Sequence, residues 1–209
     1  MEKIFKMLDN LYIQKFHQDK IEKYGSNKPE SLAWFSEEDQ QKRFEVLTQI
    51  GDLNNCSVLD IGCGNGDLCA YLSQHFTNVS YYGIDMIATF LDNAIEKNKD
   101  FLDATFYLGD FMKGKLPQTD YVLVSGSLNY KNSDSDFIFK AIAHLYAHCN
   151  KGLGFNLLSD TINPDGILKS YSPETIINFC KTLSNTVLLK EDYIANDFTV
   201  MVYKYRCFL

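Results

Sequence analysis

The stretch VLDIGCGNGDL, residues 58–68, decides the fold of this 209-residue chain. An apolar run leads into three alternate glycines, and a polar and apolar mixture with helical spacing follows, which predicts a buried strand that turns directly into a helix. Glycine tolerates the backbone angles of a sharp turn and lets the main chain approach a ligand closely. The start of a helix offers unpaired N–H groups and a partial positive charge. We therefore expect a ligand-binding turn after this strand.

Strands and helices alternate along the rest of the chain. Strands are expected at residues 57–61, 79–84, 105–108, 121–124, 154–158, 186–193 and 198–205, and helices at 1–24, 36–50, 67–76, 87–97, 136–149 and 172–183. Such alternation predicts a parallel sheet with helices on both faces, and the short last connection predicts an antiparallel pair. The fold class is therefore α/β: a doubly wound, Rossmann-like, mostly parallel seven-stranded sheet with an antiparallel C-terminal hairpin.

This pattern divides the chain into two segments. Residues 1–50 are expected to form an N-terminal helical lid that docks on the sheet domain, which spans residues 51–209. The first helix carries an apolar stripe at helical spacing, formed by Ile4, Leu8, Leu11, Tyr12 and Phe16.

Composition excludes several classes of protein. The formal net charge of -7 argues against a nucleic-acid partner that is held by bulk electrostatics. No apolar run approaches the roughly 18 residues of a membrane span, and the start MEKIFKMLDN does not resemble a signal peptide. The six cysteines fit no zinc template. We expect a cytoplasmic protein without a metal site or a membrane partner, and the oligomeric state is left open.

Acidic residues stand at the ends of the first three expected strands. Ligands of open parallel sheets bind beyond the carboxyl ends of the strands. Asp85 ends the second strand, where a carboxylate can accept hydrogen bonds from both hydroxyls of a ribose. Asp60, just before the glycines, suits an ammonium group better than a phosphate. A nucleotide-dependent oxidoreductase is an alternative, but Asp67 occupies the place of the third glycine in its G-x-G-x-x-G motif.

The motif at residues 58–66 resembles the first motif of the class I S-adenosylmethionine-dependent methyltransferases, V-L-D-x-G-x-G-x-G, at every specified position. The resemblance covers about residues 57–160 and the closing hairpin, and it implies S-adenosylmethionine as the cofactor. It implies that Met86 packs on the adenine and that Asp110 accepts a hydrogen bond from the adenine amine. The cofactor contacts expected in the sheet domain are Asp60, Gly62, Cys63, Gly64, Gly66, Asp85, Met86, Asp110, Phe111 and Ser125.

The segment before the glycine motif also resembles a known element. Residues 31–36, with the only tryptophan, and the basic residue Arg43 are similar to the lid of a group of small bacterial class I methyltransferases. The resemblance implies that Trp34 covers the cofactor and that Arg43 faces its carboxylate. Only Arg43 and Arg206 are arginines among 20 basic residues, which draws attention to position 43. The alternatives are a packing anchor for Trp34 and a solvated helix face for Arg43.

These observations predict an enzyme, a methyltransferase that transfers the methyl group of S-adenosylmethionine to an unidentified small-molecule acceptor. A general base is optional because the methyl donor is already activated, and the candidates for a catalytic role are Tyr130, Asp160 and Tyr171. The loop 159–171 is expected to help roof the cleft, although it could simply cross the sheet edge. An RNA or protein methyltransferase and a non-catalytic S-adenosylmethionine-binding module are the alternative functions.

Overall fold

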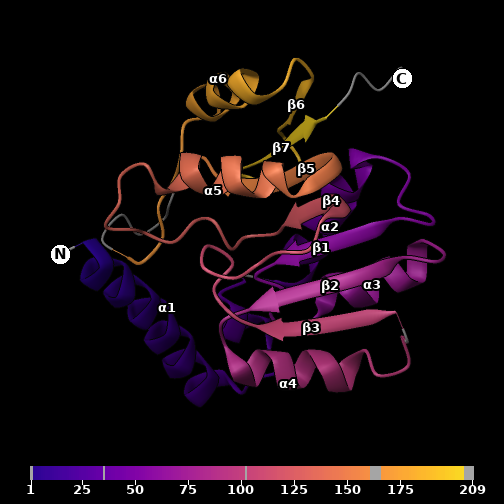
Figure 1. Ribbon diagram of the computed structural model, residues 1–209. Helices are drawn as coiled ribbons and strands as arrows, with labels where there is room; N and C mark the ends of the chain where they lie inside the picture. The colour runs from indigo at the N-terminus through magenta and orange to yellow at the C-terminus, as the bar shows by residue number, and fades with distance from the viewer. Residues whose placement is uncertain (1, 35, 102, 161–165, 205–209) are drawn as a thin grey trace.

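The computed structural model describes residues 2–34, 36–101, 103–160 and 166–204. The strands form one sheet in the order β3-β2-β1-β4-β5-β7-β6 (Figure 1). Strands β1 to β5 pair in parallel where they are neighbours, and β7 runs antiparallel to both β5 and β6. This confirms the expected mostly parallel sheet with an antiparallel hairpin. The strands are β1 (Ser57–Ile61), β2 (Ser80–Asp85), β3 (Ala104–Leu108), β4 (Thr119–Val124), β5 (Cys149–Leu158), β6 (Val187–Lys190) and β7 (Asp197–Tyr203).

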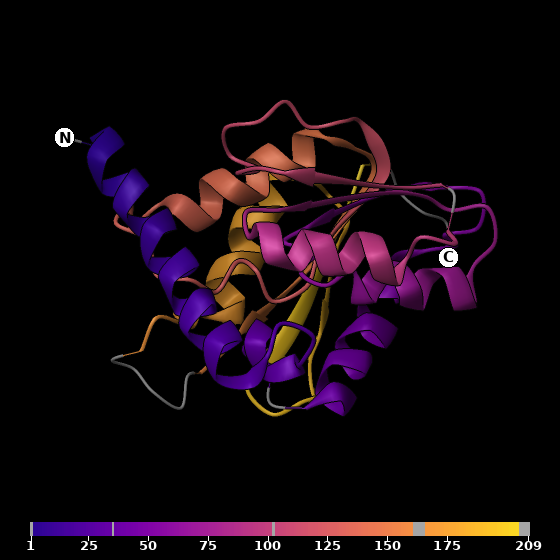
Figure 2. The ribbon, with the colours of Figure 1, turned by 90° about the horizontal axis from the view of Figure 1, so that it is seen from below.

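Helices cover both faces of the sheet (Figure 2). They are α1 (Glu2–Tyr24), η1 (Pro29–Leu32), α2 (Glu37–Leu47), η2 (Thr48–Ile50), α3 (Asp67–His75), α4 (Ala88–Lys97), α5 (Phe137–Ala147) and α6 (Pro173–Leu183). Alternate side chains of a strand point to opposite faces. Val58 accordingly belongs to the apolar cluster of α2 and α3, and Leu59 belongs to the cluster of α5 and α6. This two-sided core gives the sheet its doubly wound architecture.

Strand β5 is longer than its sequence predicts. The expected helix at 136–149 ends at Ala147, and the strand expected to begin at Gly154 begins at Cys149. The reason is pairing on both sides: Cys149 pairs with Thr119 of β4, and Gly152 pairs with β4 and with β7. These partners come from distant parts of the chain, so the local pattern could not reveal them.

Helix α2 is part of the core of the sheet domain. The Ser36 side chain caps it by accepting a hydrogen bond from the Asp39 N–H at 3.0 Å, as the serine before an acidic first turn predicts. Leu47 is fully buried, and its Cδ1 atom lies 3.1 Å from the place where a Cβ atom on Gly154 would be. A glycine in β5 thus lets the helix approach the sheet. The boundary at residue 50 between lid and domain stays a prediction, but α2 packs as an integral helix.

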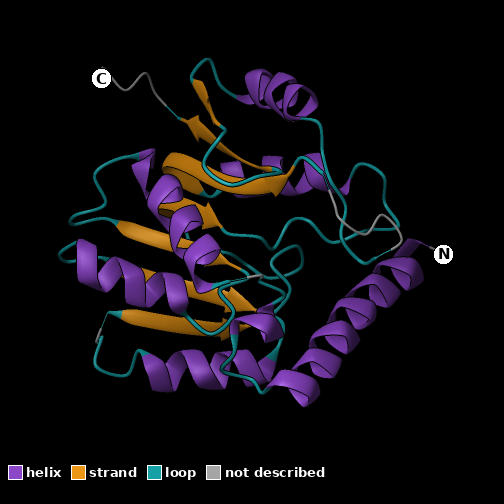
Figure 3. Ribbon diagram, turned by 180° about the vertical axis from the view of Figure 1, so that it is seen from behind, coloured by secondary structure: helices purple, strands orange, loops and turns teal. Residues whose placement is uncertain are grey.

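Helix α1 crosses the carboxyl ends of the strands, away from both faces of the sheet (Figures 1 and 3). Three members of its expected apolar stripe do not make the contact, since Leu8, Leu11 and Tyr12 are 43%, 49% and 74% exposed. Among residues 8–24 of this helix, the buried side chain is instead His17. The docked face carries Asn10 and His17 beside Ile13, because it meets the polar ends of strands and not an apolar sheet face. At 23 residues α1 is the longest helix described, yet neither it nor any other described helix is apolar enough to cross a membrane.

The packing of α2 predicts the effect of truncating its central apolar residue. Leu47→Ala should lower the free energy of unfolding by about 2–5 kcal/mol, because it leaves a cavity between α2 and β5. Leu11→Ala, on the exposed side of α1, should change it by less than about 0.5 kcal/mol. Denaturant unfolding measures both values. Equal effects of the two substitutions would contradict the assignment of α2 to the core.

Candidate functional site

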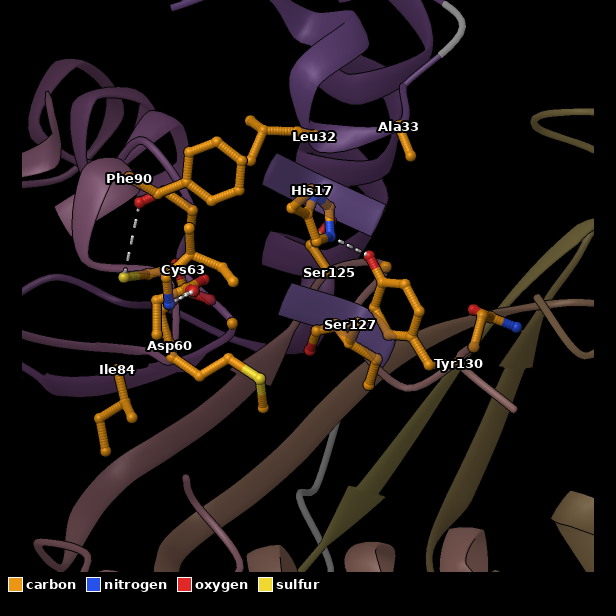
Figure 4. A pocket seen from close by; sticks show the side chains of 18 of the residues that line it. His17, Leu32, Ala33, Asp60, Cys63, Ile84, Phe90, Ser125, Ser127 and Tyr130 are labelled. Atoms are coloured by element: carbon orange, nitrogen blue, oxygen red, sulfur yellow. Dashed lines mark hydrogen bonds between the residues drawn. The ribbon is translucent and has the colours of Figure 1, made fainter. Parts of the chain in front are cut away.

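A pocket lies at the carboxyl ends of β1, β2 and β4, between these strand ends and α1 (Figure 4). The expected cofactor-binding residues gather there from six parts of the chain. Those that line it are Trp34, Arg43, Asp60, Gly62, Cys63, Gly64, Asp85, Met86, Asp110, Phe111 and Ser125. The exception is Gly66, which is not among the described lining residues.

The glycine turn has the backbone that its sequence predicts. Gly62, Gly64 and Gly66 have φ values of +71°, +52° and +71°, in the left-handed region that favours glycine. A Cβ atom on Gly62 would lie 2.3 Å from the Cβ of Ser127, so only a residue without a side chain fits where the turn passes the segment after β4. Gly66 serves packing instead, because a Cβ there would lie 3.0 Å from the Cβ of Ala94 on α4.

Two buried carboxyl groups face this turn. Asp85 Oδ2 accepts a hydrogen bond from the Gly64 N–H at 2.9 Å, and Oδ1 accepts one from the Ile87 N–H at 2.8 Å. Asp60 Oδ2 accepts a hydrogen bond from the Tyr81 hydroxyl at 2.6 Å. Burial raises the pKa of both carboxyl groups, and it raises that of Asp60 to about 7, against the opposing bond from Tyr81. A cation bound beside Asp60 would favour its ionised form.

Cys63 sits inside the turn between these two carboxyl groups. Its side chain is 7% exposed. Burial raises the pKa of its thiol well above the ordinary value, and the negative charges of Asp60 and Asp85 act in the same direction. Cys63 is therefore a protonated thiol that fills space, and it lacks the electropositive surroundings of a reactive cysteine.

At the end of β3, Asp110 is engaged with α1. Its carboxylate accepts a hydrogen bond from Asn10 Nδ2 at 2.9 Å and forms an ion pair with Lys113 at 2.9 Å. It also accepts a hydrogen bond from the Met112 N–H at 2.9 Å. The expected contact of Asp110 with an adenine amine stays a prediction. The observed contacts show that this acid also ties the first helix to the sheet.

Trp34 and Arg43 form one side of the pocket. Trp34 follows η1, and its ring lies 2.5 Å from the place where a Cβ atom on Gly126 would be, so the lid closes directly on the end of β4. The Arg43 guanidinium lies 4.7 Å from the centre of the Trp34 ring. Its Nε and Nη2 atoms lie 2.7 Å and 2.5 Å from Asp197 Oδ2. Arg43 is buried, which rules out the solvated helix face. Its contact with a cofactor carboxylate stays a prediction.

The three candidates for a catalytic role lie at different distances from the pocket. Tyr130 lines the pocket, but Asp160 and Tyr171 are not among the described lining residues. Tyr171 packs against the cluster of α5 and α6, and Asp160 is exposed. Part of the expected roof, residues 161–165, lies outside the described residues. From the remainder of that loop, Leu168 reaches the pocket and pairs with Tyr130 in an isolated bridge.

Sequence reasoning missed several polar residues of the pocket, and two of them are deeply buried. His17 of α1 is 5% exposed, and Asn156 of β5 is 1% exposed. Asn156 Oδ1 accepts a hydrogen bond from the Gly126 N–H at 3.1 Å. In the described part of the chain, Asn156 Nδ2 and Ser125 Oγ are buried without a hydrogen-bond partner, which suits a site for a polar ligand. An asparagine within the apolar run GFNLL was the available signal for Asn156.

Comparison with known proteins agrees with this arrangement. Residues 58–152 match the model of a family described as a methyltransferase domain. The protein "Putative methyltransferase Rv1506c" of Mycobacterium tuberculosis is 29% identical over an alignment of 157 residues, and the match covers 71% of this chain and 93% of that protein.

Solved structures share the fold. The N-methyltransferase NodS from Bradyrhizobium japonicum, in complex with S-adenosyl-L-homocysteine, has a TM-score of 0.69 at 14% identity, and the match covers 91% of this chain and 97% of NodS. Magnesium protoporphyrin IX methyltransferase from Synechocystis, with the same ligand, has a TM-score of 0.65 at 18% identity, and the match covers 80% and 84% of the two chains. The matched family model and the shared fold confirm the resemblance of this chain to the class I S-adenosylmethionine-dependent methyltransferases.

Proposed function

We propose that this protein transfers the methyl group of S-adenosylmethionine to a small-molecule acceptor. The observation that carries the proposal is the glycine turn facing two buried carboxyl groups, Asp60 and Asp85, in one pocket. The residues present fit the cofactor. Asp60 suits its ammonium group, and each oxygen of Asp85 keeps a lone pair for a ribose hydroxyl after accepting one backbone N–H. The Ser125 hydroxyl and the Asn156 Nδ2 group, which are buried without a hydrogen-bond partner among the described residues, offer further polar contacts.

When bound, S-adenosylmethionine supplies a methyl group that is already activated by its sulfonium. The chain then has to bind and orient the two reactants and to exclude water from them. Helix α1, which crosses the strand ends (Figure 3), and Trp34, which lines the pocket, supply the cover. A covered pocket favours a small acceptor, and the net charge of -7 disfavours RNA. An RNA or protein substrate would need an open surface here. Turnover of any acceptor would exclude a non-catalytic binding module.

Ligand binding tests the cofactor assignment. Calorimetric titration should show binding of S-adenosylmethionine and of S-adenosyl-L-homocysteine, and no tight binding of NAD. Asp85→Ala should weaken cofactor binding about 10- to 100-fold, because charge-assisted hydrogen bonds are worth roughly 1.5–3 kcal/mol. Asp92→Ala, an exposed acid on α4, is the matched control and should bind like the wild type. A preference for NAD would refute the proposed function.

The pKa of Asp60 predicts a pH dependence of cofactor affinity. With a pKa of about 7 in the free protein, the group is neutral below pH 7, and an ammonium ligand must displace its proton. Affinity for S-adenosylmethionine should therefore rise about tenfold from pH 6 to pH 8. In Asp60→Asn the residue cannot ionise, so the affinity should be weaker and nearly constant over this range. A flat profile in the wild type would show that Asp60 does not face the ammonium group.

The proposed role of Arg43 in cofactor binding can be tested separately from its ion pair with Asp197. Arg43→Lys keeps the charge but loses the planar fork, and it should weaken cofactor binding by about tenfold if the fork also holds the cofactor carboxylate. Asp197→Asn disturbs the ion pair and leaves the guanidinium in place, so it should lower the melting temperature with a smaller effect on binding. Calorimetry and thermal unfolding are measured on both variants. Wild-type affinity in Arg43→Lys would assign Arg43 to structure alone.

A further inference from the structure

A second pair of polar side chains meets across the pocket, on the side of α1. His17 Nδ1 lies 2.8 Å from the carbonyl oxygen of Ser31 in η1, and His17 Nε2 lies 2.7 Å from the Tyr130 hydroxyl (Figure 4). Both side chains line the pocket with Asp85 and Ser125. The pair joins residues 113 positions apart in the chain. It therefore exists only because α1 crosses the end of β4.

The hydrogen-bond partners determine the tautomer of His17. A carbonyl oxygen can only accept, so Nδ1 must carry the hydrogen. In the neutral imidazole Nε2 then holds a lone pair, and the Tyr130 hydroxyl donates to it. The pair thus has a fixed direction, in which the proton of Tyr130 points toward His17.

The surroundings keep this pair neutral. Burial lowers the pKa of His17, and Lys20 on the same helix acts in the same direction, against the hydrogen bond to the Ser31 carbonyl. Burial raises the pKa of Tyr130, and the negative charge of Asp85 at the end of β2 acts in the same direction. The ring that α4 packs edge-on against His17, at 5.3 Å, is the apolar Phe90. At neutral pH the pair is a phenol beside an imidazole that can take up a proton.

Two further contacts hold α1 in this position. Asn10 donates to Asp110 at 2.9 Å, and Asp9 accepts hydrogen bonds from the backbone N–H and hydroxyl of Ser133 at 3.0 Å and 2.6 Å. These contacts lie two turns before His17 on the helix. They fix its rotation, so His17 is oriented by more than its own hydrogen bonds.

We infer that His17 and Tyr130 are a proton-accepting pair for the acceptor, so that the acceptor reacts through a hydroxyl or amine that loses a proton on methylation. The inference rests on the proposed function and narrows its substrate class. Apolar side chains also line the pocket, among them Ile13 one turn before His17 on α1, Phe137, and Leu168, which pairs with Tyr130. The acceptor is therefore a small molecule with an apolar body and one protic nucleophile.

The proton balance of the step is simple. A bond forms between the acceptor oxygen or nitrogen and the methyl carbon, while the bond between that carbon and sulfur breaks and its electron pair stays on sulfur. The acceptor proton passes to the Tyr130 oxygen as the Tyr130 proton passes to His17 Nε2. The imidazolium that results keeps its Nδ1–H bond to the Ser31 carbonyl, and it later releases its proton to water.

The first test needs no acceptor. In the full chain with ¹⁵N-labelled histidine, NMR titration should show His17 as the Nδ1–H tautomer, with a pKa below the ordinary histidine value. His17→Asn identifies its resonances. Tyr130→Phe should shift the Nε2 resonance, and Tyr12→Phe, on the exposed side of α1, should not. An Nε2–H tautomer or an imidazolium at pH 7 would overturn the inference.

The second test compares acceptors that differ in one proton. Release of S-adenosyl-L-homocysteine is measured with phenols and primary amines, and with pyridines and dialkyl sulfides of matched size. Turnover should be confined to the protic compounds, with an acid limb in the pH profile of kcat. Tyr130→Phe and His17→Asn should lower kcat about 100-fold or more, and the acid limb should vanish in His17→Asn. Calorimetric affinity for S-adenosylmethionine should change far less than kcat.

Control measurements distinguish a failure of the proposed function from a failure of the proton-accepting pair. Tyr12→Phe and His75→Asn remove exposed groups of the same chemistry and should leave kcat unchanged. Absence of S-adenosylmethionine binding in the wild type would refute the proposed function itself. Cofactor binding with wild-type kcat in both pair variants, or methylation of the aprotic compounds alone, would overturn only the proton-accepting pair.

Discussion

The hydrogen bond from the Gly64 N–H to Asp85 connects the ends of two adjacent parallel strands, and the pocket depends on it. Parallel pairing of β1 with β2 brings both carboxyl ends to the same edge. There the glycine turn must leave β1 sharply, and its left-handed backbone exposes N–H groups that need an acceptor. Asp85 provides one. One carboxylate therefore holds both the turn and the start of α4, and these two segments form the floor of the pocket beside β1 and β2.

Local pattern predicts most of the fold. Ser36 and Ser172 each cap the helix that they were expected to begin, and the strands around the glycine turn lie where their apolar runs predict. The pattern fails where partners come from afar. The start of β5 at Cys149 depends on pairing with Thr119, which no window around residue 149 contains. The rotation of α1 is another such case, because polar contacts with strand ends override its apolar stripe.

The residues of the candidate site likewise fall into those that the sequence predicts and those that it does not. Acids at or near the ends of strands, such as Asp85 and Asp110, could be placed from sequence because strand ends of a parallel sheet converge. The hydrogen-bond and ion-pair partners of the site residues could not be predicted from the sequence. Arg43 was singled out as a rare arginine, but its ion pair with Asp197 spans 154 positions. His17 was overlooked because an isolated histidine in a polar helix carries no local signal. Its burial follows only from the position of α1 over β4.

Cys63 has a consequence for the chemistry of the pocket. A thiolate is a better nucleophile than a hydroxyl or an amine, and a sulfonium held beside one would alkylate it. The cofactor site proposed above places a methyl donor within the same turn as this cysteine. Burial, and after it the two neighbouring carboxyl groups, raises the pKa of this thiol, which keeps it in its weakly nucleophilic protonated form. The acids that bind the donor would thereby also protect the protein from methylating itself.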